Sequence, residues 1–261
     1  MIRQLGDLYA WLLGWPALAP LHKGFFYLSA RAMGLQNFAS DFVSGESRAA
    51  AACLAGKRAP VVFDVGANEG NWLTAVLRIA PDARLHAFEP QPALAEKIRV
   101  RTRGVEVTNA AIGEHPGTLT LYDYADHPGS SHASLLPGVI DGVHGGTPRS
   151  TAVPVIRLDD YCQEHSIEAI DLLKIDVEGF ELAVLRGAHR LLQAGKVAAI
   201  QFEFNEMNVV SRIFLRDFFQ LLGPGYRLYR VLPHGLLSLK TNSLWLNEQF
   251  VFQNVVALRV A

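Results

Sequence analysis

The chain has 261 residues, a length that suits one α/β domain with additions. Half of its residues are hydrophobic, which allows a sizeable buried core. Its 24 basic and 25 acidic residues nearly cancel, so the charge balance gives no reason to expect a nucleic-acid partner. Cys53 and Cys162 have neither metal-ligand spacing nor a disulfide framework, and we expect reduced thiols in a cytoplasmic protein.

Residues 1–58 are predicted to form a helical extension or cap, with breaks at Pro16–Pro20 and near Gly34. The apolar run over 8–21 is shorter than a membrane span. Asp7 and Pro16 also argue against a signal peptide. We expect these amphipathic helices to cover the domain, to form a homodimer contact, or to make a peripheral contact with a membrane surface.

From Pro60 onward, strands and helices alternate, which predicts an α/β domain over residues 59–261. We expect a doubly wound, mostly parallel sheet with helices on both faces. Residues 113–117 are predicted to form a hairpin turn into strand 118–122, and residues 125–150 a long functional or mobile loop. The expected strands are 61–65, 84–88, 105–109, 153–158, 170–175, 197–204, 226–232 and 250–259, and the expected helices are 69–79, 91–102, 181–194 and 211–222.

The stretch Val61–Gly70 is the most informative part of the chain. A β-branched strand carries Asp64 near its end, and a turn containing Gly66 and Gly70 leads into an apolar helix. Such glycines let the backbone approach a ligand, and the helix N-terminus offers free N–H groups. A second strand ends in Glu89, about 20 residues later, where an acid suits a pair of ribose hydroxyls. These residues predict a site for a nucleoside-bearing cofactor.

The turn argues against a dinucleotide. Asn68 and Asn71 stand where the later glycines of G-x-G-x-x-G are needed, and Asp64 would repel a pyrophosphate. An acid there suits an amino group, and S-adenosylmethionine carries an ammonium, a carboxylate and a ribose but no phosphate. The sequence therefore favours S-adenosylmethionine. A nicotinamide-dependent sugar oxidoreductase and a non-catalytic cofactor-binding scaffold remain alternatives.

Polar residues at the carboxyl ends of parallel strands are the candidates for chemistry. Asp176 follows strand 170–175 and shares a face with Lys174, and Glu203 lies near the end of the next strand. Asp176 is interpreted as a general base or a clamp for a substrate hydroxyl, with a helix cap as the alternative. Lys174 is better explained by a structural ion pair. Asp176 and Glu203 would also suit Mg²⁺, but no spacing requires it, and we predict no metal.

One histidine of the long loop is a further candidate. His132 lies in Pro128–Leu135 among serine hydroxyls, and an imidazole titrates near working pH. It is a candidate to take a proton from a substrate hydroxyl, although the pattern favours a solvated loop histidine. The loop itself is predicted to close over the acceptor together with part of residues 1–40.

Taken together, these motifs resemble the FkbM family of S-adenosylmethionine-dependent methyltransferases. The matching segments are 62–70, 87–90, 109–113, 134–135, 157–160 and 171–181, in that order along the chain. The resemblance implies a Rossmann-like class I methyltransferase fold with a seven-stranded sheet. It also implies O-methylation of a hydroxyl on a sugar, glycan or natural product.

The resemblance also implies roles for individual residues. Glu89 would bind the ribose hydroxyls, and Asp176 would lie beside the sulfonium and the acceptor. The methionine part would be held by Asp64, Gly66, Asn68 and Gly70, and the adenine would lie by Asn109 and Ala111.

Overall fold

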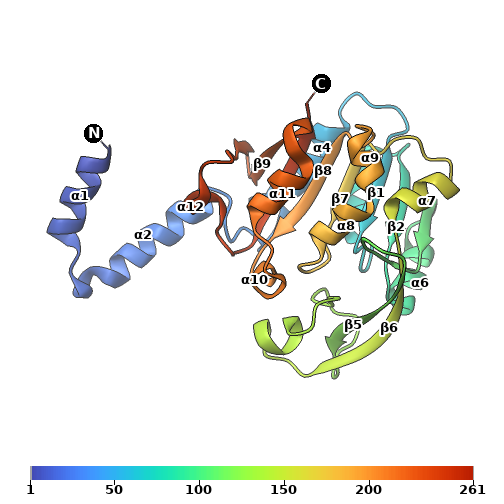
Figure 1. Ribbon diagram of the computed structural model, residues 1–261, viewed down its shortest axis with the longest axis horizontal. Helices are drawn as coiled ribbons and strands as arrows, with labels where there is room; N and C mark the ends of the chain where they lie inside the picture. The colour runs from blue at the N-terminus through green and yellow to red at the C-terminus, as the bar shows by residue number, and fades with distance from the viewer. Residues whose placement is uncertain (1, 261) are drawn as a thin grey trace.

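The computed structural model of the protein describes residues 2–260, and its centre is an eight-stranded sheet (Figure 1). The strand order is β10-β9-β11-β8-β7-β1-β2-β3. From β8 to β3 the neighbouring strands are parallel, whereas β11, β9 and β10 are antiparallel. The strands are β1 (Val61–Val65), β2 (Arg84–Phe88), β3 (Val105–Thr108), β7 (Leu172–Ile175), β8 (Ala199–Phe204), β9 (Tyr226–Leu232), β10 (Gly235–Ser238) and β11 (Gln253–Arg259).

Helices cover both faces of this sheet. On one face Leu73, Val76 and Ile98 pack against Val62 and Leu85 of the strands. That layer holds α4 (Glu46–Leu54), α5 (Asn71–Ile79) and α6 (Pro92–Arg101). The other layer holds α7 (Leu158–Glu164), α8 (Glu181–Gly187), α9 (His189–Gln193) and α11 (Leu215–Leu222), and its core includes the stacked rings of Phe202 and Phe218. Burial on both faces explains the near-continuous apolar runs of the central strands.

The order of the strands reverses between β1 and β7. The chain runs outward from β1 to β2 and β3, returns to β7, and continues to β8 on the other side. Asp64 pairs in register with Lys174, and Val65 pairs with Ile175. In open parallel sheets the crevice at such a switch point is where ligands bind.

The predicted doubly wound fold is confirmed, but the expected count of seven strands is too low. Gly235–Ser238 pairs with β9 and adds an eighth strand at the edge. A separate three-stranded sheet contains β4 (Ala111–Ile112), β6 (Pro148–Ile156) and β5 (Gly117–Tyr124), in that spatial order. The predicted hairpin at 113–117 is therefore wrong, because β6 lies between the two strands and pairs with both.

Two predicted helices are broken. The helix expected over 181–194 divides into α8 and α9 at Ala188, next to Gly187, whose Cα lies against the backbone of Gly113. The helix expected over 211–222 begins only at Leu215, and α10 (Met207–Ser211) precedes it. The remaining short elements are η2 (Val139–Val143), η3 (Gly223–Gly225) and α12 (Leu244–Asn247).

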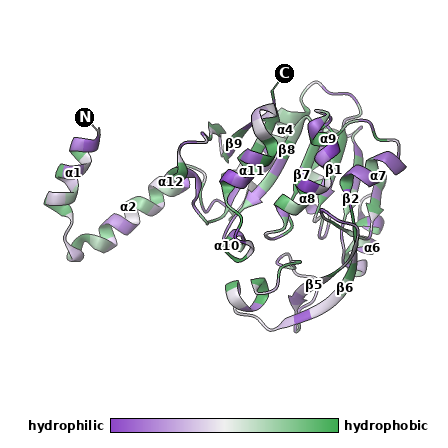
Figure 2. Cartoon of the chain, viewed as in Figure 1, coloured by the Kyte–Doolittle hydropathy of each residue, from purple (hydrophilic) through white to green (hydrophobic). Residues whose placement is uncertain are grey.

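The N-terminal region is helical, with breaks near the predicted places. Its elements are α1 (Ile2–Leu13), η1 (Pro16–Leu18), α2 (Ala19–Ala32) and α3 (Asp41–Ser44). Figures 1 and 2 show α1 and α2 projecting away from the body of the protein, whereas α4 packs on the sheet through Ala50 and Leu54. Over residues 2–260, none of the helices combines the length and the apolar character needed to cross a membrane. The domain boundary at residue 58 stays a prediction.

Candidate functional site

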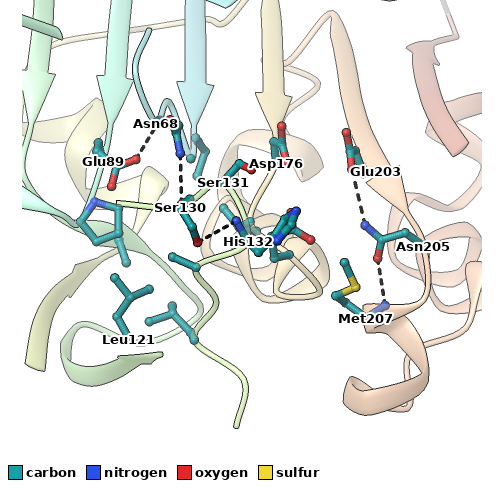
Figure 3. A pocket seen from close by; sticks show the side chains of 18 of the residues that line it. Asn68, Glu89, Leu121, Ser130, Ser131, His132, Asp176, Glu203, Asn205 and Met207 are labelled. Atoms are coloured by element: carbon teal, nitrogen blue, oxygen red, sulfur yellow. Dashed lines mark hydrogen bonds between the residues drawn. The ribbon is translucent and has the colours of Figure 1, made fainter. Parts of the chain in front are cut away.

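A cavity of about 560 Å³ lies at the carboxyl ends of the central strands (Figure 3). Its walls come from the turn after β1, the ends of β2, β7 and β8, strands β4 and β5, the loop after β5, and the segment that follows α2. Seven of the ten predicted site residues line it: Gly66, Asn68, Glu89, Ala111, His132, Asp176 and Glu203. Asp64, Gly70 and Asn109 lie outside the lining.

Gly66 allows two strand ends to approach each other. Its φ is +85°, and a Cβ at this position would collide with the backbone carbonyl of Asp176. The N–H groups of Gly66 and Ala67 donate to the carbonyl of Phe88 at 2.9 and 3.2 Å. A residue without a side chain is required here, and it brings the turn, the end of β2 and the end of β7 together at the cavity.

Glu89 holds the turn from the side of β2. Its carboxylate accepts the backbone N–H of Asn68 at 2.8 Å and that of Gln91 at 2.9 Å, and the side chain is 4% exposed. Burial raises the pKa of Glu89 to about 7, and the two N–H groups act in the opposite direction. Each carboxylate oxygen has a second lone pair, so Glu89 retains the capacity to accept ligand hydroxyls.

Three other predicted cofactor residues differ in position. The side-chain amide of Asn68 donates to the carbonyl of Ser130 at 3.2 Å and joins the turn to the long loop. The amide of Asn109 donates to the carbonyls of Glu89 and Pro90, so it holds the backbone at the end of β2 rather than lining the cavity. Gly70 is the left-handed residue before α5 and packs against Ile98.

Asp64 is buried beneath the cavity. It is 1% exposed, and its two carboxylate oxygens have no hydrogen-bond partner within residues 2–260. Burial raises the pKa of Asp64 to about 6, although the Lys174 ammonium, 3.9 Å from Oδ1, opposes the shift. A buried carboxylate without a hydrogen-bond partner is costly, and a positively charged group placed beside it, in addition to Lys174, would lower that cost. This feature fits the ammonium of S-adenosylmethionine.

Lys174 bridges two of the predicted acids. Its Nζ lies 2.8 Å from Asp176 Oδ2 and 3.9 Å from Asp64 Oδ1. Burial would lower the pKa of Lys174, but the two carboxylates more than offset burial and raise it, so the side chain is charged. The ion pair orients Asp176, whose side chain is 31% exposed and lines the cavity.

Further acids face the same cavity. Besides Asp176 and Glu203, the lining includes Glu178 and Glu206. Burial raises the pKa of both Glu178 and Glu203 well above the ordinary value, and the nearby Asp176 carboxylate adds to the shift. Oε2 of Glu178 is buried without a hydrogen-bond partner in the described chain. Among the described residues no group of three or more metal-ligating side chains has the geometry to hold a metal ion.

His132 does reach the cavity, as Figure 3 shows, and it is part of an aromatic group. Its Nδ1 lies 3.0 Å from the hydroxyl of Tyr124, and its ring stacks on His144 at 4.1 Å with an interplanar angle of 8°. Burial lowers the pKa of His144, which also lines the cavity and which our reading of the sequence missed. The contact with Tyr124 leaves His132 Nε2 as the ring nitrogen available to a ligand.

The segment after α2 also reaches the site. Gln36 donates its side-chain amide to Glu206 at 3.1 Å, and its backbone N–H donates to Phe252 at 2.8 Å. Phe38 meets Phe252 edge to face at 5.9 Å, and Gln36, Phe38 and Phe252 line the cavity. These individual residues were missed, since no local pattern marks side chains that reach the cavity from a distant part of the chain.

Comparison with known proteins agrees with this geometry. A family model described as the methyltransferase FkbM domain matches residues 64–228. The chain belongs to the FkbM methyltransferase family. It is an S-adenosylmethionine-dependent O-methyltransferase, and the predicted family, enzyme class and cofactor are confirmed.

Relatives with known activities cover much of the domain. The 2-O-methyltransferase NoeI of Sinorhizobium fredii is 31% identical over 195 residues, which are 68% of this chain and 76% of NoeI. The 31-O-demethyl-FK506 methyltransferase FkbM of Streptomyces tacrolimicus is 33% identical, over 49% of this chain and 58% of that protein. The hexuronic acid methyltransferase AglP of Haloferax volcanii is 30% identical, over 51% of this chain and 52% of AglP. Among solved structures, the plantazolicin methyltransferase BpumL covers 97% of this chain and 93% of its own at 10% identity, with a TM-score of 0.46.

Proposed function

We propose that this FkbM-family enzyme methylates a hydroxyl group of a sugar or glycan. The observation that carries the proposal is that one cavity joins the Gly66 turn and Glu89 to the carboxylates of Asp176 and Glu203. The Gly66 turn and Glu89 suit the cofactor. Asp176 and Glu203 are placed to accept hydrogen bonds from the hydroxyl groups of the methyl acceptor. When bound, S-adenosylmethionine supplies a methyl group on a positively charged sulfur.

The cavity lining supports an acceptor with several hydroxyls. Glu178, Glu203, Asn205, Glu206 and Gln36 all contribute to the lining and carry acceptor or donor atoms. Apolar side chains also line the wall and suit the carbon faces of a ring, among them Leu121, Leu135, Met207 and Phe252. NoeI and AglP carry names that describe O-methylation and hexuronic acid methylation, and these names support the same acceptor class.

In this proposal the protein's own residues align the acceptor and remove its proton. Asp64, which is buried outside the cavity lining, attracts the cofactor ammonium by its charge. Gly66 and Asn68 shape the turn around the methionine part, and Glu89 accepts the ribose hydroxyls. Asp176, oriented by Lys174, accepts the hydrogen bond of the reacting hydroxyl. His132 is the second candidate for the proton, through Nε2. Correct alignment supplies much of the rate when the donor is already reactive.

Two rival functions receive less support. A nicotinamide-dependent oxidoreductase would place a pyrophosphate near Asp64, a buried carboxylate whose oxygens have no hydrogen-bond partner in the described chain. A non-catalytic scaffold would not need the acids at the ends of β7 and β8 to face the cavity. A cytoplasmic location, where S-adenosylmethionine is supplied, is part of the proposal.

Replacement of Asp176 tests the proposal. Transfer of a labelled methyl group to a panel of sugars and glycans identifies an acceptor, and Asp176→Asn is expected to lower kcat by roughly 10²-fold because the hydroxyl loses its partner. Affinity for S-adenosylhomocysteine, measured by calorimetry, should stay within a few-fold.

The matched control is Asp160→Asn on α7, whose carboxylate pairs with Arg190 far from the cavity. It should leave kcat unchanged. Turnover of Asp176→Asn within a few-fold of the wild type would show that Asp176 is a structural cap. Binding of NAD without binding of S-adenosylhomocysteine would overturn the proposed function as a whole.

A further inference from the structure

The first two helices expose a large apolar surface. From residue 3 to residue 29 none of the described side chains is buried, and the first buried one is Ala30. The exposed side chains include Trp11 at 79%, Trp15 at 67%, Phe26 at 66% and Leu28 at 65%. Figure 2 shows that both helices carry hydrophobic residues and stand clear of the domain. Exposed apolar side chains gathered on one segment in this way mark an interaction site.

The two helices form a defined bend. The hydroxyl of Tyr9 lies 3.0 Å from His22 Nδ1, and the rings of these residues meet edge to face. His22 Nε2 lies 2.9 Å from the carbonyl of Leu13. Pro16 lies between the helices and Pro20 lies in the first turn of α2, where a continuous helix would need backbone N–H donors that proline lacks. His22 therefore ties the start of α2 to α1 across the bend.

Among the described residues, neither helix is long enough to cross a bilayer. With 12 and 14 residues, α1 and α2 are about 18 and 21 Å long. On α1, Leu5, Leu8, Tyr9 and Leu12 project to one side, and Arg3 and Asp7 project to the other. This is the pattern of a helix that lies in the boundary between lipid headgroups and acyl chains.

Charge and residue type favour a bilayer over a second copy of the chain. Residues 1–40 contain three basic residues, Arg3, Lys23 and Arg31, and a single acid, Asp7. Two copies paired through this surface would bring like charges together. An anionic lipid surface attracts the same charges, and tryptophan and tyrosine prefer the membrane–water boundary.

We infer that α1 and α2 form an interfacial anchor that binds an anionic lipid bilayer. The anchor ends beside the cavity, because Gln36 and Phe38, which follow α2, both line the cavity wall. Binding to the bilayer holds that wall next to the membrane surface.

Vesicle sedimentation tests the anchor without reference to catalysis. The full-length protein should sediment with vesicles of equal parts phosphatidylcholine and phosphatidylglycerol, and much less with phosphatidylcholine alone. High salt should weaken the binding. The variant Leu8→Ser/Trp11→Ser/Phe25→Ser/Phe26→Ser should bind these vesicles at least about tenfold more weakly, since four apolar side chains leave the bilayer.

The matched control is Val100→Ser on α6, which is 75% exposed and lies on the domain. It should bind vesicles as the wild type does. Unaltered affinity for S-adenosylhomocysteine shows that each variant is folded. Equal sedimentation of wild type and quadruple variant would overturn the inference. So would a wild-type dimer in sedimentation equilibrium that the quadruple variant abolishes, because α1 and α2 would then contact a second copy.

Discussion

Glu89 performs a structural task with the same carboxylate that is proposed to bind ribose. It accepts the N–H groups of Asn68 and Gln91, so it fixes both the glycine turn and the start of α6 before any ligand is bound. A carboxylate that is already positioned costs little conformational entropy on binding. The pocket side of β2 is therefore organised in advance.

Glu89→Gln separates charge from shape. The amide has the size of the carboxylate, but its NH₂ group cannot accept a hydrogen bond. One of the two contacts with backbone N–H groups and one contact with a ribose hydroxyl should therefore be lost. Hydrogen bonds to charged groups are worth about 1.5–3 kcal/mol each, so calorimetry should show S-adenosylhomocysteine binding weakened by about 10- to 100-fold.

Glu96→Gln on the exposed face of α6 provides the control for that measurement, because its side chain is 65% exposed and pairs only with Arg99 at 3.3 Å among the contacts described. Its affinity should equal that of the wild type. If Glu89→Gln also binds as tightly as the wild type, Glu89 supports the turn and does not contact the ribose.

At the scale of elements, the loop after β5 is ordered by one buried acid. Asp123 accepts the N–H groups of Tyr124, Gly129 and Ser130, and its Oδ1 accepts the Ser130 hydroxyl at 2.6 Å. Ser134 adds a hydrogen bond from its hydroxyl to the carbonyl of Glu178 at 2.7 Å. These contacts hold Ser130–Leu135 along the cavity wall, between the Gly66 turn and the end of β7.

Asp123→Asn is expected to loosen this loop. An amide accepts through one oxygen instead of two, so about two charged hydrogen bonds are lost. Limited proteolysis should cut residues 125–135 faster than in the wild type. The KM for the acceptor should rise about tenfold or more while the fold remains intact, because the loop supplies His132.

The neighbouring acid Asp126 gives the comparison, since its side chain is 78% exposed and pairs with His127 in the loop itself. Asp126→Asn should match the wild type in both assays. Slow proteolysis and an unchanged KM in Asp123→Asn would mean that the loop position does not depend on Asp123 and that the loop does not form part of the acceptor site.

The elements that the sequence predicts well are those whose signal is local. The strand, glycine turn and helix from Val61 to Ile79 agree with the structure to within two residues, as does the strand that ends at Phe88. Each of these elements is bounded by its own turn residues and has an apolar pattern of its own. The acids at the strand ends follow from the same logic, which is why Asp176 and Glu203 were found.

The errors arise where distant segments decide the structure. Nothing near 113–117 indicates that β6 lies between β4 and β5. The strand that pairs with both is formed by residues 148–156, which are far along the chain. Next to the break at Ala188, a side chain at Gly187 would collide with the backbone carbonyl of Gly113, 74 positions away along the chain. Gln36 and His144 reach the cavity in the same way. Their side chains become functional candidates only through tertiary contacts.

At the scale of the whole molecule, buried acids in and near the site make stability depend on pH. Burial raises the pKa of Asp64 from 3.8 to about 6, and the pKa values of Glu89 and Glu181 from 4.5 to about 7. The folded state therefore binds more protons than the unfolded state between these limits. The free energy of unfolding must fall as pH rises from about 4 to about 7 and then level off. His86 and His144, whose pKa values burial lowers, oppose this near pH 6.

The cofactor should reverse part of this effect, because its ammonium favours ionised carboxylates. Without ligand, the melting temperature is expected to be several degrees higher near pH 5.5 than near pH 8. Binding of S-adenosylhomocysteine should release protons, so its affinity should rise over the same range. Scanning fluorimetry gives the melting temperature at each pH, and calorimetry in buffers of different ionisation enthalpy counts the protons.

Glu181→Gln, which removes a buried acid outside the cavity lining, should flatten the pH dependence of the melting temperature without changing proton release. If the melting temperature of the wild type rises steadily with pH, these acids are ionised in the folded protein without ligand. The same follows if the melting temperature of Glu181→Gln depends on pH as steeply as that of the wild type.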